Sequence, residues 1–334
     1  MNINQSNIVQ NLKDKKSYDH PISKFRILET HISWIILTGN FAYKIKKNIK
    51  FGQVLDFSNL QLRKICCEKE VLLNRPLCGE MYQKVVKIVF ENNIYKIVEL
   101  NQKGKPLEYA VKMLEIPQKF RMDNLVKNKK VDNTIIDNLT NILFKFHESA
   151  MISDKITSFG HPDFMREKVN ENFRTISKFY QIDSFLEDRL NIFIENNLDL
   201  FYQRMKKYKI RDIHGDLYLR NIFILDDCFY LYDRIEFNDS LRYADIMEDV
   251  AHLAMDLDFH NRSDLSQNFI SYYINRTKDY DIKKMIFFMM CYKACVRGKV
   301  SLFRANEVLW NKKHKYLKEA KLHFELAKEY TKQF

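Results

Sequence analysis

The sequence is poor in glycine and lacks the glycine-rich motifs of common nucleotide-binding loops. Seven of its 334 residues are glycine, and neither G-x-G-x-x-G nor G-x-x-x-x-G-K-[ST] occurs. The six cysteines include no C-x-x-C pair, and Cys291 and Cys295 are simply one helical turn apart. This spacing is typical of free thiols in a reducing compartment. A bound nucleotide would therefore need a site other than a P-loop.

Long hydrophobic runs are also missing. The longest, residues 285–292, has eight residues and ends at Lys293, whereas a membrane-spanning helix needs about 20. The first residues have neither the basic start nor the apolar core of a secretory signal. We therefore expect a cytoplasmic protein without a membrane partner.

Charge of one sign is in excess, but it is not concentrated. Lysine and arginine number 55 and aspartate and glutamate 43, for a net charge of +12, which raises the possibility of a nucleic-acid partner. Residues 226–258, however, hold ten acidic residues and two arginines, and the lysines elsewhere are scattered among asparagine and isoleucine. We interpret these lysines as a solvated surface. Steep salt dependence of RNA or DNA binding would contradict that interpretation.

One loop, residues 213–221 (the H-G-D loop), and an aspartate after it carry the chemistry. Asn221 lies five positions after Asp216, and Asp233 follows twelve positions later. Two apolar runs around residues 226–227 predict a hairpin that brings Asn221 and Asp233 to the same end. Phosphoryl transfer to a hydroxyl needs a carboxylate that accepts the proton, an amide oxygen on one Mg²⁺ and a second carboxylate that bridges metal and ATP. We assign these roles to Asp216, Asn221 and Asp233.

The loop resembles the catalytic loop of the aminoglycoside phosphotransferase (kinase-like) family, H-G-D-x-x-x-x-N followed by an aspartate on the next hairpin. Here the motif begins at His214. Residues 233–251 are similar to a bacterial branch that is often fused to a P-loop ATPase domain. The resemblance implies ATP and Mg²⁺ as cofactors and a small-molecule hydroxyl as acceptor. It also implies a catalytic-loop position for His214 and a bracing role for Asp249 against the loop backbone.

Strand patterns come before helical ones, which is typical of an α+β protein with segregated parts. Strand-like runs lie at residues 25–28, 34–37, 41–46, 82–90, 94–99 and 108–115, and helical patterns at 58–77, 133–149, 164–180, 184–207, 282–305 and 313–331. With the resemblance, these runs predict a bilobal protein-kinase-like fold with an antiparallel-sheet N-lobe and a mainly helical C-lobe. We expect an ATP-binding lobe over residues 1–115, a five-stranded sheet plus a helix. The helical lobe, residues 116–334, would hold the H-G-D loop and the acceptor pocket.

The N-terminal lobe of such a fold pairs a strand lysine with a helix glutamate at the ATP phosphates. Lys44 fits the lysine spacing best, and Lys46 is its rival because alternate side chains of a strand share a face. Glu70 is the favoured helix partner, and Glu68 is the other choice. We expect Ser58 to cap this helix and the following Pro76 to lie beyond its end.

The resemblance implies further contacts to the nucleotide. Ser33, in the E-T-H-I-S segment, takes the place of a phosphate-binding loop. The backbone from Met113 to Glu115 runs into the hinge and would bind the adenine edge.

Departures from protein kinases bear on the acceptor. Gly215 replaces the arginine before the catalytic aspartate, and neither D-F-G nor A-P-E occurs, so we expect no phosphorylation switch and a small acceptor. Tyr218 stands where protein kinases often have a lysine, which leaves Arg220 or the metals to neutralise the γ-phosphate. Glu236, three positions after Asp233, would touch metal or substrate or serve as a hydrogen-bond partner.

Two opposed features leave the acceptor's charge open. Lys293 and Arg297, one helical turn apart, would contact an acceptor with a carboxylate or phosphate, or form a surface cation pair. The acidic stretch of residues 226–258 would instead suit a polycationic aminoglycoside. A nucleotide-binding regulator without turnover is the alternative function, although retention of the whole motif set argues against it.

Overall fold

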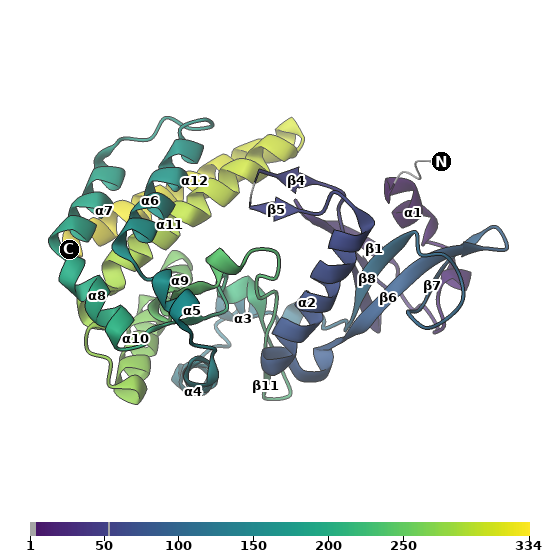
Figure 1. The fold of residues 1–334 in the computed structure, drawn as a ribbon, viewed down its shortest axis with the longest axis horizontal. Helices are drawn as coiled ribbons and strands as arrows, with labels where there is room; N and C mark the ends of the chain where they lie inside the picture. The colour runs from purple at the N-terminus through teal and green to yellow at the C-terminus, as the bar shows by residue number, and fades with distance from the viewer. Residues whose placement is uncertain (1–4, 53) are drawn as a thin grey trace. The chain divides into compact units, whose positions relative to one another are not determined.

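The computed structural model describes residues 5–52 and 54–334, the side chain of Asn311 excepted. The chain divides into two compact units. Unit 1 runs to Arg121 and also contains Ile222–Asn238, and unit 2 contains Met122–Asn221 and Asp239–Phe334. An antiparallel sheet dominates unit 1, whereas unit 2 is mainly helical (Figure 1). The α+β class and the order of strands before helices are as predicted.

Unit 1 is built on a six-stranded sheet in the order β1-β2-β3-β8-β6-β7, with every neighbouring pair antiparallel. Its strands are β1 (Arg26–Glu29), β2 (Ser33–Leu37), β3 (Phe41–Lys46), β6 (Tyr82–Glu91), β7 (Ile94–Glu99) and β8 (Glu108–Leu114). The prediction of five strands is wrong by one, because all six strand-like runs pair. A separate two-stranded ladder joins β4 (Lys50–Phe51) and β5 (Leu55–Asp56).

Two helices cover opposite faces of this sheet (Figure 1). Helix α1 (Gln5–Asn11) completes a buried apolar cluster with Tyr43 and Ile45 of β3. Helix α2 (Leu60–Cys78) packs on β6 and β8 at the other face, toward which the lysines of β3 point. Strand alternation thus separates an apolar face from a charged one.

The N-terminal cap of α2 differs from the prediction. Asn59 caps the helix, with its side chain accepting from the backbone of Leu62 at 2.9 Å. Ser58 instead donates its hydroxyl to Asp56 at 2.6 Å. Pro76 lies inside the helix rather than beyond it. Both predictions are wrong; the proline stands in the last turn of the helix, which ends at Cys78.

The hairpin after the H-G-D loop forms as predicted. Strands β10 (Ile222–Leu225) and β11 (Cys228–Leu231) pair with Ile222 opposite Leu231. Asp226 and Asp227 both have left-handed backbones, φ 50° and 60°, as a tight two-residue hairpin turn requires. The hairpin belongs to unit 1, because α2 packs on β11 and residue 121 bridges to residue 223. The units therefore differ from the predicted division into residues 1–115 and 116–334.

Unit 2 consists mainly of helices. They are α3 (Met122–Lys127), α4 (Asn133–Ser149), α5 (Asp154–Ser158), α6 (Pro162–Ile176), α7 (Phe185–Asn196), α8 (Leu198–Lys206), α9 (Met247–Phe259), α10 (Ser263–Thr277), α11 (Ile282–Glu307) and α12 (Trp310–Tyr330). Strands β9 (Ile210–Asp212) and β12 (Tyr243–Asp245) pair with each other. The predicted helix over residues 184–207 is two helices, because Asn197 has the non-helical dihedrals φ −127°, ψ 26°.

Short 3₁₀ turns connect these elements: η1 (Lys15–Ser17), η2 (Gly79–Met81), η3 (Gln118–Phe120), η4 (Leu219–Asn221), η5 (Asp239–Leu241) and η6 (Thr331–Gln333). Of these, η4 forms the end of the H-G-D loop, and it contacts both α3 and α9. The end of the H-G-D loop therefore packs against two helices of unit 2.

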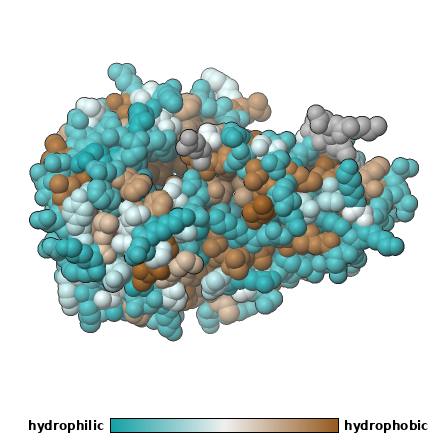
Figure 2. All heavy atoms as spheres, in the orientation of Figure 1, coloured by the Kyte–Doolittle hydropathy of each residue, from teal (hydrophilic) through white to brown (hydrophobic). Residues whose placement is uncertain are grey.

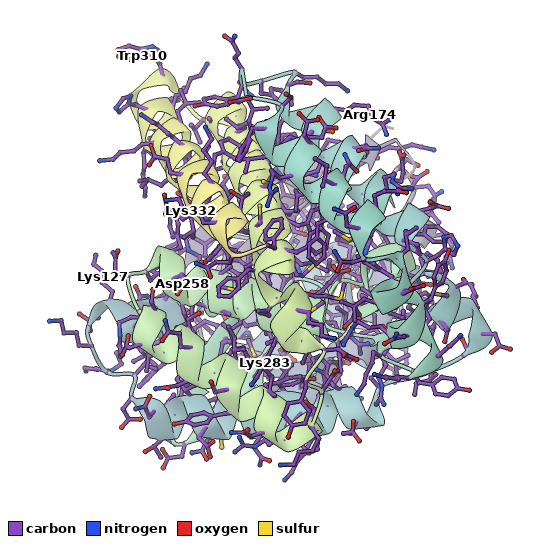
Figure 3. The ribbon with its side chains drawn as sticks, turned by 90° about the vertical axis from the view of Figure 1, so that its left-hand side faces the viewer. Lys127, Arg174, Asp258, Lys283, Trp310 and Lys332 are labelled. Carbon is purple, nitrogen blue, oxygen red and sulfur yellow. The ribbon has the colours of Figure 1, made fainter. Side chains whose placement is uncertain are left out.

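Helix α12 packs along α11 in unit 2. Figure 3 shows it from Trp310 at its N-terminal end to the vicinity of Lys332. Gly298 of α11 permits this close approach, since a Cβ there would collide with the ring of Phe324. The other end is fixed by Tyr330, whose hydroxyl donates to Asp258 at 2.7 Å.

The visible surface is mixed in polarity. In Figure 2, hydrophilic residues cover much of the face shown, and hydrophobic residues form groups among them. In the part of the chain that the structure describes, no helix has the length and apolar character needed to cross a membrane.

Candidate active site

Two buried lysines of β3 share one glutamate of α2. Lys44 Nζ lies 2.7 Å from Glu70 Oε1, and Lys46 Nζ lies 2.7 Å from Glu70 Oε2. Glu68 is directed elsewhere and pairs with Lys64 at 3.5 Å. Of the pairings that the sequence left open, the structure thus brings Glu70 to both lysines.

Each lysine has a second carboxylate from the segment that follows the hairpin. Lys44 Nζ lies 2.5 Å from Asp233 Oδ1, and Lys46 Nζ forms an ion pair with Glu236. The Asp233 side chain is 41% exposed, whereas that of Glu236 is 3% exposed. A ligand can therefore reach Asp233, while Glu236, a predicted substrate contact, is enclosed in an ion pair.

Opposite charges set the ionisation of this cluster. Burial by itself would raise the pKa of Glu70, but the two lysines lower that pKa to about 2. Burial would lower the pKa of Lys44, but Asp233 and Glu70 hold it well above its ordinary value. Lys44 and Glu70 are therefore both charged at neutral pH. For Glu236, burial outweighs Lys46 and raises the pKa.

The other predicted nucleotide contacts lie on β2 and β8. Ser33 pairs opposite Lys46 in the β2–β3 register, and its buried Oγ has no hydrogen-bond partner among the described residues. Met113 is buried within β8, between β3 and β6. The Glu115 N–H donates to the carbonyl of Asn40 at 2.9 Å, so that group is already engaged. The adenine contact stays a prediction.

The H-G-D loop is held by one face of α9. Asp249, His252 and Asp256 stand at positions i, i+3 and i+7 of that helix, so they share a face. Asp249 accepts two consecutive loop N–H groups, those of His214 and of the next residue, at 2.8 and 2.9 Å. Asp256 Oδ2 accepts the N–H of Leu219 at 2.9 Å. The bracing of the loop backbone that the resemblance implied for Asp249 is therefore present.

Asp249 is itself held by a buried chain of side chains that the sequence analysis missed. His147 Nε2 lies 3.1 Å from Asp249 Oδ2, and His147 Nδ1 lies 2.6 Å from the Tyr273 hydroxyl. Burial would raise the pKa of Asp249, but His147 and the loop contacts lower it overall. No local sequence signal links the three residues, since they come from α4, α9 and α10.

Asp216 and Asn221 are adjacent in unit 2. Asn221 Nδ2 donates to the Asp216 carbonyl at 3.0 Å, so the amide nitrogen is engaged within the loop. The Asp216 side chain is 36% exposed, and its Oδ1 lies 3.8 Å from His252 Nδ1. Burial, and then Lys293 and Arg297, keep the pKa of His252 well below its ordinary value, so this ring is neutral. The spacing of His252 from Asp249 is the signal that would have identified it.

The remaining loop residues and cations are placed as follows. His214 is fully buried, and its Nδ1 lies 3.4 Å from the Asp216 N–H. Arg220 pairs with Asp123 of α3 at 3.3 Å.

Lys293 and Arg297 are both buried in α11 and do not form the surface cation pair that we considered. Lys293 pairs with Glu248 at 2.9 Å, so its charge is compensated internally. Arg297 lies over the ring of Tyr218, 4.2 Å from the ring centroid. Arg297 thus contacts the H-G-D loop.

The two predicted metal ligands fall in different units, since unit 2 includes Asn221 and unit 1 includes Asp233. Their shared metal site stays a prediction. Within residues 5–52 and 54–334, no three His, Cys, Asp or Glu side chains gather closely enough to hold a metal ion.

Comparison with known proteins gives distant relatives. No protein-family model matches the chain. Two uncharacterized proteins, Rv2004c of Mycobacterium tuberculosis and Mb2027c of Mycobacterium bovis, are each 28% identical to it over 297 residues. The match covers 86% of this chain and 57% of each relative. The chain thus spans little more than half the length of these proteins.

Solved structures with the same fold include small-molecule kinases. A choline kinase from Cryptosporidium parvum has a TM-score of 0.54 at 12% identity, covering 98% of this chain and 96% of its own. A GDP complex of a mutant aminoglycoside 2'-phosphotransferase IIIa has a TM-score of 0.54 at 14% identity, covering 98% of each chain. A choline/ethanolamine kinase family protein from Mesorhizobium loti has a TM-score of 0.51 at 9% identity, covering 98% of this chain and 99% of its own. The predicted kinase-like fold is confirmed.

Proposed function

We propose that this chain, whose fold is that of small-molecule kinases, transfers the γ-phosphate of ATP to a hydroxyl of a small molecule. The observation that carries the proposal is the position of Lys44 Nζ, 2.7 Å from Glu70 and 2.5 Å from Asp233. In kinases a strand lysine held by a helix glutamate contacts the nucleotide phosphates, and a nearby aspartate holds the metal. Both partners of such a lysine are therefore present within unit 1.

The residues present fit Mg·ATP. Asp233 offers a partly exposed carboxylate, and Asn221 offers its amide oxygen because the amide nitrogen is engaged. Carboxylate and amide oxygens are suitable ligands for Mg²⁺. The unsatisfied hydroxyl of Ser33 would gain a partner in a phosphate oxygen, and buried polar groups normally have one. Bound Mg·ATP would supply the phosphoryl group and part of its charge compensation.

Asp216 is the group to which we assign the acceptor's hydroxyl proton. Its loop is fixed by carboxylates of α9 at several backbone N–H groups, and such fixation keeps a reacting group in position. Neutral His252 lies beside it without adding a charge. Tyr218 carries no charge where protein kinases often have a lysine. We therefore assign neutralisation of the γ-phosphate to Arg220 or to the metal ions.

Two aspartate substitutions test these roles. Asp216→Ala should lower the rate of phosphotransfer by about 10²–10⁴-fold, because general-base assistance contributes about that much, with little change in Mg·ATP affinity. Asp233→Ala should weaken Mg·ATP binding instead. Calorimetric titration with Mg·ATP and an ADP-release assay separate the two effects, and Asp199→Ala, at an exposed position of α8, is the control. Wild-type turnover by Asp216→Ala would refute the assignment.

The same experiment addresses the alternative function. A wild-type chain that binds Mg·ATP and transfers phosphate neither to an acceptor nor to water would be a nucleotide-binding regulator.

A further inference from the structure

The acidic stretch of residues 226–258 does not form an acidic pocket, because most of its carboxylates are engaged in internal ion pairs or hydrogen bonds. Their partners are lysines, arginines, a histidine, a tyrosine hydroxyl or backbone N–H groups. The pairs are Asp233 with Lys44, Glu236 with Lys46, Asp239 with Arg242, Asp245 with Arg204, Glu248 with Lys168 and Lys293, Asp249 with His147 and the loop backbone, Asp256 with the Leu219 N–H, and Asp258 with Tyr330. The reason to expect a polycationic acceptor is thereby removed.

A cavity of about 190 Å³ in unit 2 is lined by cations. The lining has four lysines and arginines, namely Arg220, Arg297, Lys315 and Lys318, which come from the H-G-D loop, α11 and α12. Of these, Arg220 is paired with Asp123. The acidic side chains of the lining are Asp256 and Glu319, and Asp256 is engaged by the loop backbone. His323, also in the lining, is neutral because burial lowers its pKa to about 3. The cavity therefore has an excess of positive charge.

Arg297 is the buried cation of this cavity. It is 5% exposed, and its Nε has no hydrogen-bond partner among the described residues. Burial would lower its pKa, but Tyr218, Asp216 and Asp256 raise it overall, so the guanidinium stays charged. A buried guanidinium with an unsatisfied N–H is costly, and an anionic oxygen in the cavity would satisfy it with a charge-assisted hydrogen bond.

The cavity is linked to Asp216 by stacked side chains. Arg297 lies over the ring of Tyr218, and that ring stacks on His252 with centroids 5.5 Å apart and planes within 10°. His252 Nδ1 lies 3.8 Å from Asp216 Oδ1. Asp216 itself is not part of the cavity lining, and in this series of contacts the rings of Tyr218 and His252 stand between Arg297 and Asp216.

We infer that this cavity binds a small anion, whose carboxylate or phosphate contacts the buried guanidinium of Arg297 beside the H-G-D loop. The inference is independent of the proposed function. The cavity is also smaller than the roughly 300–1,000 Å³ of sites for drug-sized ligands. An anionic group with a few carbon atoms suits this volume, whereas a multi-ring antibiotic does not.

Binding without nucleotide tests the inference. Glycerol 3-phosphate, glycerate, glycerol and choline are titrated calorimetrically into the full chain, so that the charge of the probe varies while its size stays small. The two anions should bind at least about tenfold more tightly than glycerol or choline, and their affinity should fall as salt rises. The relative affinity of the two anions then distinguishes phosphate from carboxylate.

Variants locate the binding. Arg297→Gln and Lys318→Gln should each weaken anion binding, by about tenfold for the buried arginine and less for the exposed lysine. Lys321→Gln, which removes the same charge from the same helix outside the cavity lining, should leave affinity unchanged. Thermal unfolding verifies that Arg297→Gln is folded, and Lys318→Gln provides the comparison in a surface position. Equal binding of all four probes, or equal loss in Lys321→Gln and Lys318→Gln, would overturn the inference.

The two proposals fail in different ways. Anion binding that is lost in Arg297→Gln, without phosphotransfer to any hydroxyl, would support the anion site and refute the proposed function. Phosphotransfer to a hydroxyl, with no anion binding, would support the function and refute the anion site.

Discussion

At the scale of single residues, Lys44 and Lys46 have similar surroundings with different consequences. They alternate on one strand, share Glu70 and are both buried. Lys44 also contacts the partly exposed Asp233, whereas Lys46 contacts the enclosed Glu236. We therefore expect Lys44 to act on a bound nucleotide and Lys46 to stabilise the unit.

Replacement of each lysine by methionine separates these roles. Lys44→Met should weaken Mg·ATP binding or turnover by at least about tenfold, because a charge-assisted contact is lost. Lys46→Met should lower the free energy of unfolding by about 3–5 kcal/mol, because it leaves buried carboxylates without their counter-ion. Urea unfolding and Mg·ATP titration measure the two quantities, with the exposed Lys50→Met as control. If Lys46→Met stayed fully stable and lost Mg·ATP binding, the two assignments would have to be exchanged.

Sequence reasoning at this scale succeeded where the signal was local. The lysine and the glutamate could be proposed from strand alternation and helix spacing. Glu236 could not be assigned to Lys46, because an ion pair between residues that far apart in the chain leaves no periodic pattern. The Arg204–Asp245 pair was missed for the same reason.

At the scale of elements, α9 is the support of the H-G-D loop. Its carboxylates at positions 249 and 256 accept three backbone N–H groups of that loop. Hydrogen bonds from its backbone to a rigid helix keep the side chains of such a loop oriented. The order of the loop thus depends on one helical face.

Asp249→Asn tests this dependence. The amide would present a donor to at least one buried N–H group, and each unsatisfied group costs about 1–3 kcal/mol. We expect the free energy of unfolding to fall by about 2–4 kcal/mol and phosphotransfer to fall with it. Asp258→Asn, on the same helix but bonded to Tyr330, is the matched control. Equal stability of Asp249→Asn and wild type in urea unfolding would show that the loop does not need α9.

Helix boundaries were predictable where capping and periodicity agree. Helix α4 has its predicted bounds, because Asp132 caps it and its apolar residues recur with helical spacing. The break between α7 and α8 at Asn197 was missed, since the apolar pattern continues through it. His252 was overlooked as a neighbour of the assigned base, although its spacing from Asp249 was visible in the sequence.

At the scale of the whole molecule, the division into units could not be predicted from the order of strands and helices. The β10–β11 hairpin follows helices in the chain but belongs to unit 1. Its contacts with α2 and residue 121 join distant parts of the sequence. The order of the elements was enough to predict the fold class, whereas predicting the unit boundaries would have required knowledge of these distant contacts.

Buried neutral histidines make the stability of the molecule dependent on pH. The pKa of His323 is lowered to about 3 and that of His252 well below 6.5, whereas unfolded histidine titrates at about 6.5. The unfolded state therefore binds more protons below that pH, and the free energy of unfolding should fall as the pH falls. The loss is about 1.4 kcal/mol per pH unit for each histidine.

Urea unfolding between about pH 6.5 and pH 5.5 measures this loss while carboxylates of ordinary pKa, about 4, are still mostly ionised. Carboxylates with lowered pKa, such as Glu70 at about 2, lose their contribution only at lower pH. The slope of the unfolding free energy against pH reports the number of protons taken up on unfolding, and His323→Gln should reduce that number by about one. A stability that does not change over this range, or an unchanged slope in His323→Gln, would contradict the neutral state of the buried ring.

The central claim is that the chain moves a phosphoryl group from ATP to a hydroxyl with Asp216 as base. Phosphorus NMR of the full chain with Mg·ATP and a panel of hydroxylated anions, neutral polyols and aminoglycosides tests it most directly, with Asp216→Asn as the blank. We predict that one acceptor converts the γ-phosphate signal into a phosphate ester while an equal amount of ADP appears. Unchanged ATP with every acceptor, or the same ester with Asp216→Asn, would contradict the claim.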